Sequence, residues 1–212
     1  NELDAKYKDF PPGWGHLRIP TSSRKAAIAG LAMYSPCKAR GVYLQRAAWL
    51  VTAILGPSAL FGRATPWVPP MEHEIWGRLT AQWRDEFGEF DELTVYQRLQ
   101  PDRQGMMFLL LNRGKPVTFI KLIPEDASAL DKEASVLRAV ADYRPTSFFA
   151  PLVYKLGRIG GWQYLAVSPM RSGLHRVAVN PPIPLIVREI QEALSSLPHP
   201  ESVPPHWQPM HG

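Results

Sequence analysis

A lysine and a glutamate form the pattern in this sequence that most directly suggests chemistry. Side chains alternate along a strand, so in the strand predicted over 117–123 Lys121 shares a face with Phe119 and Ile123. Glu133 lies on the apolar stripe of the helix predicted to follow. A buried ammonium and a buried carboxylate each cost free energy alone, and pairing is the usual remedy. We therefore expect an ion pair that holds the Lys121 ammonium ready for phosphate oxygens.

The same spacing has an ordinary structural interpretation. A lysine at the edge of a strand can extend its ammonium to water along its aliphatic stem, and a glutamate on a helix is commonly solvated. Spacing alone leaves both interpretations of Lys121 and Glu133 open.

The elements around this pair are predicted to be strands with one helix between them. Runs of apolar and β-branched residues predict five strands, over 93–99, 106–111, 117–123, 149–156 and 162–167. The helix lies between the third and fourth strands, where Asp126 or Ser128 can cap its start and Arg144-Pro145 ends it. The order is therefore β-β-β-α-β-β.

Helices are predicted on both sides of this unit, over 24–34, 39–55, 72–86 and 183–197, and an extended linker is predicted over 64–70. The second helix places several apolar residues and one arginine around one side, namely Val42, Arg46, Trp49, Leu50 and Ala53. Its apolar run is too short to span a bilayer, which needs about 20 residues. We expect a buried or interfacial helix, not an anchor.

The charge of the chain is unevenly distributed. The net charge is +5, but residues 1–70 carry a net +6 and the remainder −1. A basic front end can contact an anionic surface, so an anionic membrane surface bound through residues 18–46 is one candidate partner. The alternative is a solvated basic face packed on the main domain. No nucleic-acid recognition motif is present, and the single cysteine, Cys37, fits a cytoplasmic protein, membrane-peripheral if the basic front end binds lipid.

Four segments together resemble the aminoglycoside phosphotransferase and choline kinase group, which shares the protein kinase fold. The run Val-Thr-Phe-Ile-Lys ending at Lys121 resembles the third-strand lysine motif of kinases. Glu133 resembles the helix glutamate that pairs with that lysine. Residues 165–170 resemble the strand that enters the hinge, whose backbone receives adenine. Residues 210–212, Met-His-Gly, resemble the start of the His-Gly-Asp catalytic motif.

The resemblance implies an α+β fold built on a kinase-like small lobe, with a five-stranded antiparallel sheet and one helix over 89–170. A helical N-terminal extension and linker would occupy 1–88. The hinge and the beginning of a truncated helical large lobe would occupy 171–212.

The resemblance also implies ATP and Mg²⁺ as cofactors and an ATP-dependent phosphotransferase that acts on the hydroxyl of an unidentified small molecule. It implies these nucleotide-binding residues: Arg103, Gln104, Gly105, Lys121, Glu133, Ser168 and Met170. His211 is the candidate residue of the catalytic motif, and ligands for Mg²⁺ are expected beyond residue 212.

The sequence departs from the family pattern in three places. The loop 101–105 has one glycine instead of several, and Phe119 stands where the family has a smaller residue above the adenine. The chain stops at Gly212, before the catalytic Asp and the metal ligands. We therefore expect a fragment of a kinase or a degenerate relative that does not catalyse by itself. The alternative is a pseudokinase or a non-catalytic interaction domain that docks an anionic surface through the basic N-terminal region.

Overall fold

The computed structural model describes residues 5–13, 15–34, 38–97, 105–125, 129–169, 183–195 and 197. Its strands are β1 (Lys6–Phe10), β2 (Leu17–Pro20), β3 (Thr65–Pro66), β4 (Glu92–Gln97), β5 (Met106–Asn112), β6 (Lys115–Pro124), β7 (Val153–Ile159) and β8 (Trp162–Val167). Its helices are α1 (Arg24–Leu31), α2 (Ala39–Leu55), the short 3₁₀-helix η2 (Pro57–Ala59), α3 (His73–Phe87), α4 (Ala129–Tyr143) and α5 (Ile183–Ser195).

The strands form one antiparallel sheet of eight in the order β3-β1-β2-β4-β5-β6-β8-β7. The five predicted strands are all present and adjacent, with α4 inserted between β6 and β7 along the chain. The expected α+β class is confirmed. The expectation of a five-stranded sheet was wrong, because β1, β2 and β3 extend the sheet into the region predicted to hold only helices and a linker.

The three additional strands have little local signal. They are only five, four and two residues long, and β1 carries Lys8 at a buried position, where the residue type argues against burial. β1 and β2 pair locally with each other, but the pairing that joins them to the rest of the sheet is remote in sequence, since Leu17 of β2 faces Tyr96 of β4. Pairing between segments so far apart in sequence depends on the tertiary fold, and a local sequence pattern does not predict it.

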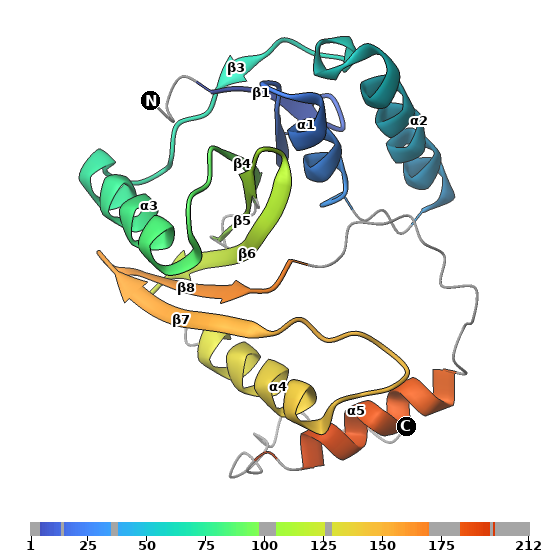
Figure 1. The fold of residues 1–212 in the computed structure, drawn as a ribbon, viewed down its shortest axis with the longest axis vertical. Coiled ribbons are helices and arrows are strands. Elements are labelled where there is room, and N and C mark those ends of the chain that lie inside the picture. Colours follow the sequence, from blue (N-terminus) through green and yellow to red (C-terminus); the bar gives the residue numbers. More distant parts are fainter. Residues whose placement is uncertain are drawn as a thin grey trace, which may run out of the picture.

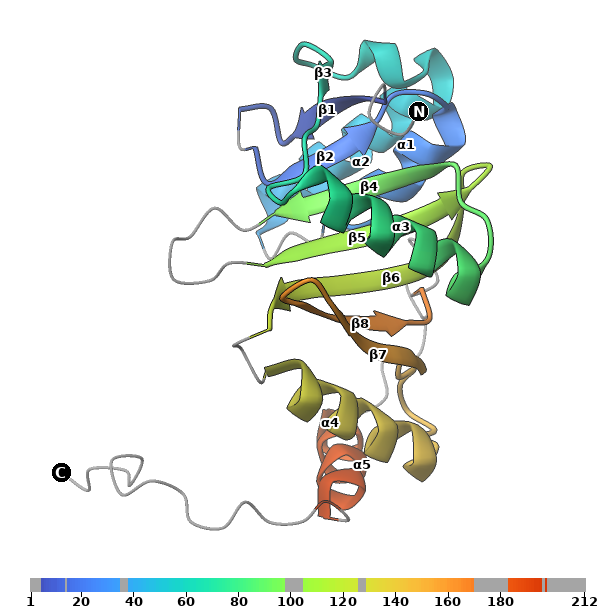
Figure 2. The same cartoon turned by 90° about the vertical axis from the view of Figure 1, so that its left-hand side faces the viewer.

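Helices cover both faces of the sheet (Figures 1 and 2). Ile120 and Leu122 of β6 belong to the core beneath α3, whereas Ile123 packs with residues of α4 and Phe119 packs at the edge of the same cluster. Alternation along β6 therefore divides the sheet into an α3 face and an α4 face. α1 covers part of the α4 face too, because Ala26 and Ala29 pack on Leu109.

The core beneath α3 is built from aromatic rings. Trp76 and Trp83 lie two turns apart on the inner side of the helix and meet edge to face at 5.8 Å between ring centroids. Trp83 contacts Phe108 of β5 at 5.4 Å and Tyr164 of β8 at 6.1 Å. Rings in such edge-to-face and tilted contacts add about 0.5–1.5 kcal/mol per pair beyond the burial of their area. The α3 face thus carries the largest cluster of buried apolar residues in the described part of the chain.

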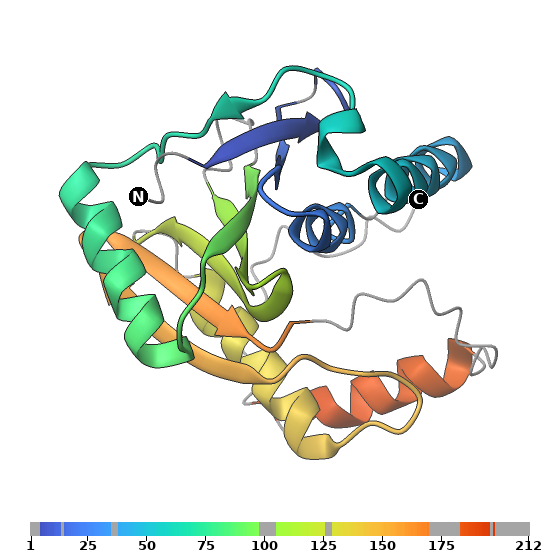
Figure 3. The ribbon, with the colours of Figure 1, turned by 45° about the horizontal axis from the view of Figure 1, so that its top comes forward.

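α2 lies outside α1, at the periphery of the molecule (Figures 1 and 3). Its buried residues are Ala48 and Thr52, whereas Trp49 and Leu50, on the side that the sequence pattern singled out, are exposed. In the described part of the chain, no helix is both long enough and apolar enough to cross a bilayer.

α1 approaches β4 so closely that a glycine is needed in the helix. A Cβ atom on Gly30 would lie 2.7 Å from Oγ1 of Thr94 and 3.3 Å from Cγ2 of Ile19, both in buried residues. Gly77 of α3 provides the contrast, since a Cβ atom there would meet nothing within 4 Å.

We expect opposite effects from the same substitution at these two helical glycines. Alanine favours a helix over glycine by about 1 kcal/mol, so Gly77→Ala should raise the free energy of unfolding by up to that amount. Gly30→Ala should lower it by about 1–3 kcal/mol, because the methyl group overpacks the contact of α1 with β4. Urea unfolding followed by circular dichroism measures both. Stabilisation by Gly30→Ala would mean that α1 does not dock on β4 as described.

Candidate functional site

The predicted ion pair of Lys121 and Glu133 is present. Nζ of Lys121 on β6 donates a hydrogen bond to Oε2 of Glu133 on α4. The strand directs Lys121 to the α4 face because its neighbours Ile120 and Leu122 are buried in the opposite core. The helix presents Glu133 beside its buried residues Leu130 and Ala134.

The pair is less buried than we expected from the pattern. The side chains of Lys121 and Glu133 are 27% and 39% exposed. Ion pairs with this access to water stabilise folded proteins by only about 0.2–1 kcal/mol. Stabilisation of the fold therefore explains little of why Lys121 and Glu133 are paired. Because the Lys121 ammonium keeps contact with solvent, it is accessible to an anionic ligand.

An apolar platform surrounds Lys121 on the α4 face. Lys121 is flanked in register by Met107 of β5 and Leu165 of β8. Phe119, two residues earlier on the same face, packs both on the cluster beneath α4 and on the cluster that contains Ala26 of α1. The ring of Phe119 therefore lies where the surfaces covered by α1 and α4 meet.

The loop expected to cover phosphates joins β4 to β5 at the Lys121 end of the hairpin. Arg103 and Gln104 lie outside the described residues. Gly105 is described, and a Cβ atom on it would lie 3.3 Å from Cγ2 of Ile123, two residues beyond Lys121. The C-terminal end of this loop is thus close to the strand that carries the lysine.

The structure gives Ser168 a role in pairing strands. Its backbone N–H donates to the carbonyl oxygen of Leu152 at 2.8 Å, and its Oγ accepts from the N–H of Leu152 at 2.9 Å. These two groups tie the end of β8 to the segment before β7, which leaves the carbonyl oxygen and the hydroxyl proton of Ser168 to serve a nucleotide. Met170 and His211 lie outside the described residues.

A buried carboxylate on α5 binds the connection between α4 and β7. Glu189 accepts four hydrogen bonds, from the backbone N–H and hydroxyl groups of Thr146 and Ser147, at distances between 2.5 and 3.2 Å. Those from Ser147 and Thr146 lower the pKa of Glu189 to about 2, despite the opposing effect of desolvation. This contact holds α5 against the end of α4, the helix that carries Glu133.

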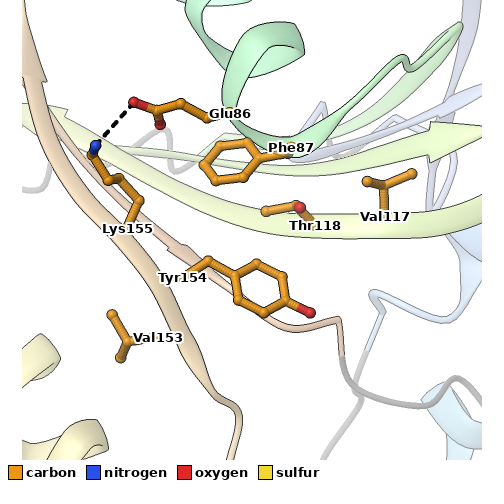
Figure 4. Close-up of a pocket in the computed structure, with 7 residues that line it drawn as sticks. All are labelled: Glu86, Phe87, Val117, Thr118, Val153, Tyr154 and Lys155. Atoms are coloured by element: carbon orange, nitrogen blue, oxygen red, sulfur yellow. Dashed lines mark ion pairs between the residues drawn. The ribbon is translucent and has the colours of Figure 1, made fainter.

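A hollow of about 650 Å³ lies away from the pair, at the end of α3 and the start of β7 (Figure 4). It is lined by Glu86, Phe87, Val117, Thr118, Val153, Tyr154 and Lys155. Lys155 pairs with Glu86 at 3.3 Å. Partial burial raises the pKa of Glu86, but hydrogen bonds from Gln82, Tyr164 and Lys155 outweigh it, so the pKa is lowered. Glu86 thus stays ionised, and it pairs with Lys155, the one basic residue among the described residues that line this hollow.

The sequence analysis missed two of these features. Nothing in the local pattern distinguishes Glu189 from Glu192 on the same helix, because the hydroxyl groups that bind Glu189 lie more than 40 residues earlier. The network of Glu86, Tyr164 and Lys155 likewise joins three separate elements. The pairing of Lys121 with Glu133 could be predicted because the strand and the helix that carry them follow one another along the chain.

We expect the stability contributed by Glu189 to depend on pH. Because its pKa is lowered to about 2 from an ordinary value near 4.5, the folded state favours the ionised form. The contribution is present above about pH 4.5 and is lost as the pH falls towards 2. Glu189→Gln should therefore lower Tm clearly at pH 7, and the difference from the unsubstituted protein should shrink between pH 4.5 and 2.

Glu192→Gln is the matched control, since Glu192 is an exposed residue of α5 that pairs with Arg188 and accepts a hydrogen bond from the Tyr143 hydroxyl, which a glutamine oxygen can also accept. It should change the free energy of unfolding by at most about 0.5 kcal/mol. An equal loss of Tm in both variants, independent of pH, would contradict the role given to Glu189.

No group of three or more His, Cys, Asp or Glu side chains within the described ranges is arranged to hold a metal ion. Comparison of the chain with protein-family models, curated proteins and solved structures finds no match. The site is therefore characterised by the ion pair of Lys121 and Glu133 and by the order of the strands and the helix around it.

Proposed function

We propose that this chain is the nucleotide-binding part of an ATP-dependent phosphotransferase that acts on the hydroxyl group of a small molecule. The observation that carries the proposal is the ion pair between Lys121 on β6 and Glu133 on α4. Kinases use such a lysine and glutamate, placed on a strand and on the helix that follows it, to hold the phosphates of ATP.

The arrangement of elements supports the proposal. β4, β5, β6, α4, β7 and β8 follow one another in the order that the resemblance to kinases implies, and the five strands are neighbours in the sheet. Lys121 lies on the strand flanked by β5 and β8, where the loop between β4 and β5 and the end of β8 can both approach one ligand. The end of β8 would then contact the base, and the loop and Lys121 would contact the phosphates.

The residues take the following roles in this proposal. Lys121 binds the α- and β-phosphates, Glu133 orients Lys121, and the loop at 102–105, with Arg103, Gln104 and Gly105, covers the phosphates. The segment 168–170 meets the adenine, Ser168 through its carbonyl oxygen and Met170 through its backbone. ATP would supply the transferred phosphoryl group and Mg²⁺ would neutralise its charge.

The weak stabilisation expected from the ion pair favours a role in binding. A lysine retained for stability would be more buried or would bind several acceptors, as Lys8 does with the carbonyl oxygens of Ser58 and Leu60. Lys121 instead has one partner, Glu133, among the interactions of the described residues, and it keeps access to water. In this proposal the described residues serve nucleotide binding, whereas catalysis would also need metal ligands and an Asp that orients the acceptor.

We expect Lys121→Met to weaken ATP binding without unfolding the protein. Hydrogen bonds to charged groups contribute about 1.5–3 kcal/mol, so the loss should be roughly tenfold or more in Kd. Tm should change little, because partly exposed ion pairs contribute at most about 1 kcal/mol. Isothermal titration with ATP in the presence of Mg²⁺ measures affinity, and calorimetry measures Tm.

Lys155→Met is the matched control, because Lys155 also pairs with a glutamate on a helix but lines the hollow near α3. It should leave the affinity for ATP unchanged. A loss of affinity in Lys155→Met but not in Lys121→Met would place the nucleotide in that hollow and refute the proposal. Nucleotide binding without phosphoryl transfer in the full-length protein would identify a pseudokinase.

Phe119 should stack on the base of the nucleotide. Its ring borders the platform beside Lys121, and stacking of a base on an aromatic side chain contributes about 1–3 kcal/mol. Phe119→Ala should therefore weaken ATP binding by roughly fivefold to 150-fold, whereas Phe119→Trp should retain it. Tighter binding by Phe119→Ala would show instead that the ring obstructs the base. The same titrations, with Tm as a check on folding, decide between these results.

A further inference from the structure

The outward side of α2 carries an apolar stripe that no described residue covers. We define the α2 outer face as Tyr43, Ala47, Leu50 and Ile54, which follow one another at helical spacing on one side of the helix. Tyr43, Leu50 and Ile54 are 70%, 54% and 62% exposed. Ala48 and Thr52, on the opposite side, are the buried residues of α2.

This orientation is held by polar contacts at several points along the helix. Nε2 of Gln45 donates to the carbonyl oxygen of Leu31 in α1 at 2.9 Å. The guanidinium of Arg24 donates to the carbonyl oxygen of Ile54 at 3.2 Å. Beyond the helix, Nζ of Lys8 binds the carbonyl oxygen of Ser58 at 2.7 Å. α2 cannot rotate its outer face inward without breaking these bonds.

Further apolar and basic residues border the α2 outer face. The exposed apolar residues are Leu44, Trp49, Leu55 and Phe61, and the exposed basic residues are Lys38, Arg40, Arg46 and Arg63. No Asp or Glu occurs in the sequence between Asp9 and Glu72. The patch therefore combines apolar surface with positive charge that no acidic residue of this part of the chain neutralises.

We propose that the α2 outer face docks on an anionic lipid bilayer, with α2 lying in the plane of the headgroups. Tyr43 and Trp49 suit this depth because each joins an apolar ring to a polar group. Arg40 and Arg46 would contact lipid phosphates while Leu50 and Ile54 enter the acyl boundary. Interfacial helices bind in this way, through buried apolar area together with attraction between basic side chains and anionic lipid.

The charge pattern favours lipid over a second copy of the chain. A second copy of the chain would bring the same basic residues against one another, so Arg40 and Arg46 would meet like charges. A bilayer containing anionic lipid supplies negative charge everywhere along the face and apolar depth beneath it. Docking through α2 leaves Lys121 and Glu133 on the α4 face, so this inference is independent of the proposed nucleotide site.

The test is sedimentation of the protein with vesicles of phosphatidylcholine alone and of phosphatidylcholine mixed with phosphatidylglycerol. We expect binding to the anionic vesicles and weaker binding to the neutral ones. Leu50→Glu should reduce binding to anionic vesicles roughly tenfold or more, because it removes a buried apolar side chain and adds a repelled charge. Arg40→Ala and Arg46→Ala should each reduce it about fivefold.

Leu152→Glu is the matched control, since Leu152 is 53% exposed, close to the value for Leu50, but lies next to the edge strand β7 at the other end of the sheet. It should bind vesicles as the unsubstituted protein does, and both variants should keep the original Tm.

Three results would overturn the proposal. The first is no sedimentation with anionic vesicles, and the second is an equal loss of binding in Leu50→Glu and Leu152→Glu. The third is a concentration-dependent dimer, seen by analytical ultracentrifugation, that Leu50→Glu abolishes while vesicles are not bound. That result would assign the α2 outer face to a second copy of the chain.

Discussion

The contact of the Lys121 ammonium with the Glu133 carboxylate links the sheet to the helix that crosses its α4 face. Its position is set by two periodicities, alternation along β6 and the helical repeat of α4, and by the burial of the neighbouring residues on both elements. Because the pair remains partly exposed, it adds little to stability. Its value lies in holding a positive charge at a defined place on an otherwise apolar surface.

The two faces of the sheet differ in what they contribute. The α3 face is closed by tryptophans packed on Phe108 and Tyr164, and these rings supply large buried area. The α4 face is covered in two parts, by α1 and by α4, and Phe119 lies where the two coverings meet. The aromatic core thus lies on one side of the sheet, and the partly exposed Lys121 lies on the other.

The N-terminal region belongs to the same sheet and also carries a surface of its own. β1 and β2 continue the sheet beyond β4, and α1 packs on it so closely that Gly30 has no room for a side chain. α2 packs mainly on α1, with Ala48 reaching the cluster of Phe10, Leu17 and Ile19, and the other side of this apolar helix is left to solvent. The stripe of α2 is therefore unlike the stripes of α3 and α4, which both face the sheet.

Within each element, the sequence by itself determined which residues share a face. Alternation put Lys121 beside Phe119, and helical spacing put Glu133 on the apolar stripe of its helix. The pattern of apolar residues also gave the order of the five central strands, although β7 begins four residues later than predicted. These properties are local, since they depend on neighbours within about one or two turns or on the next residue but one.

Only the tertiary structure decided which faces turn inward and which remote segments meet. It placed β1 and β2 in the sheet through the pairing of Leu17 with Tyr96, and it brought Glu189 to Thr146 and Ser147. It also turned the apolar stripe of α2 outward. The physical reason is that the burial of an apolar stripe depends on the competing surfaces available in the folded chain, and hydrophobic attraction is not directional.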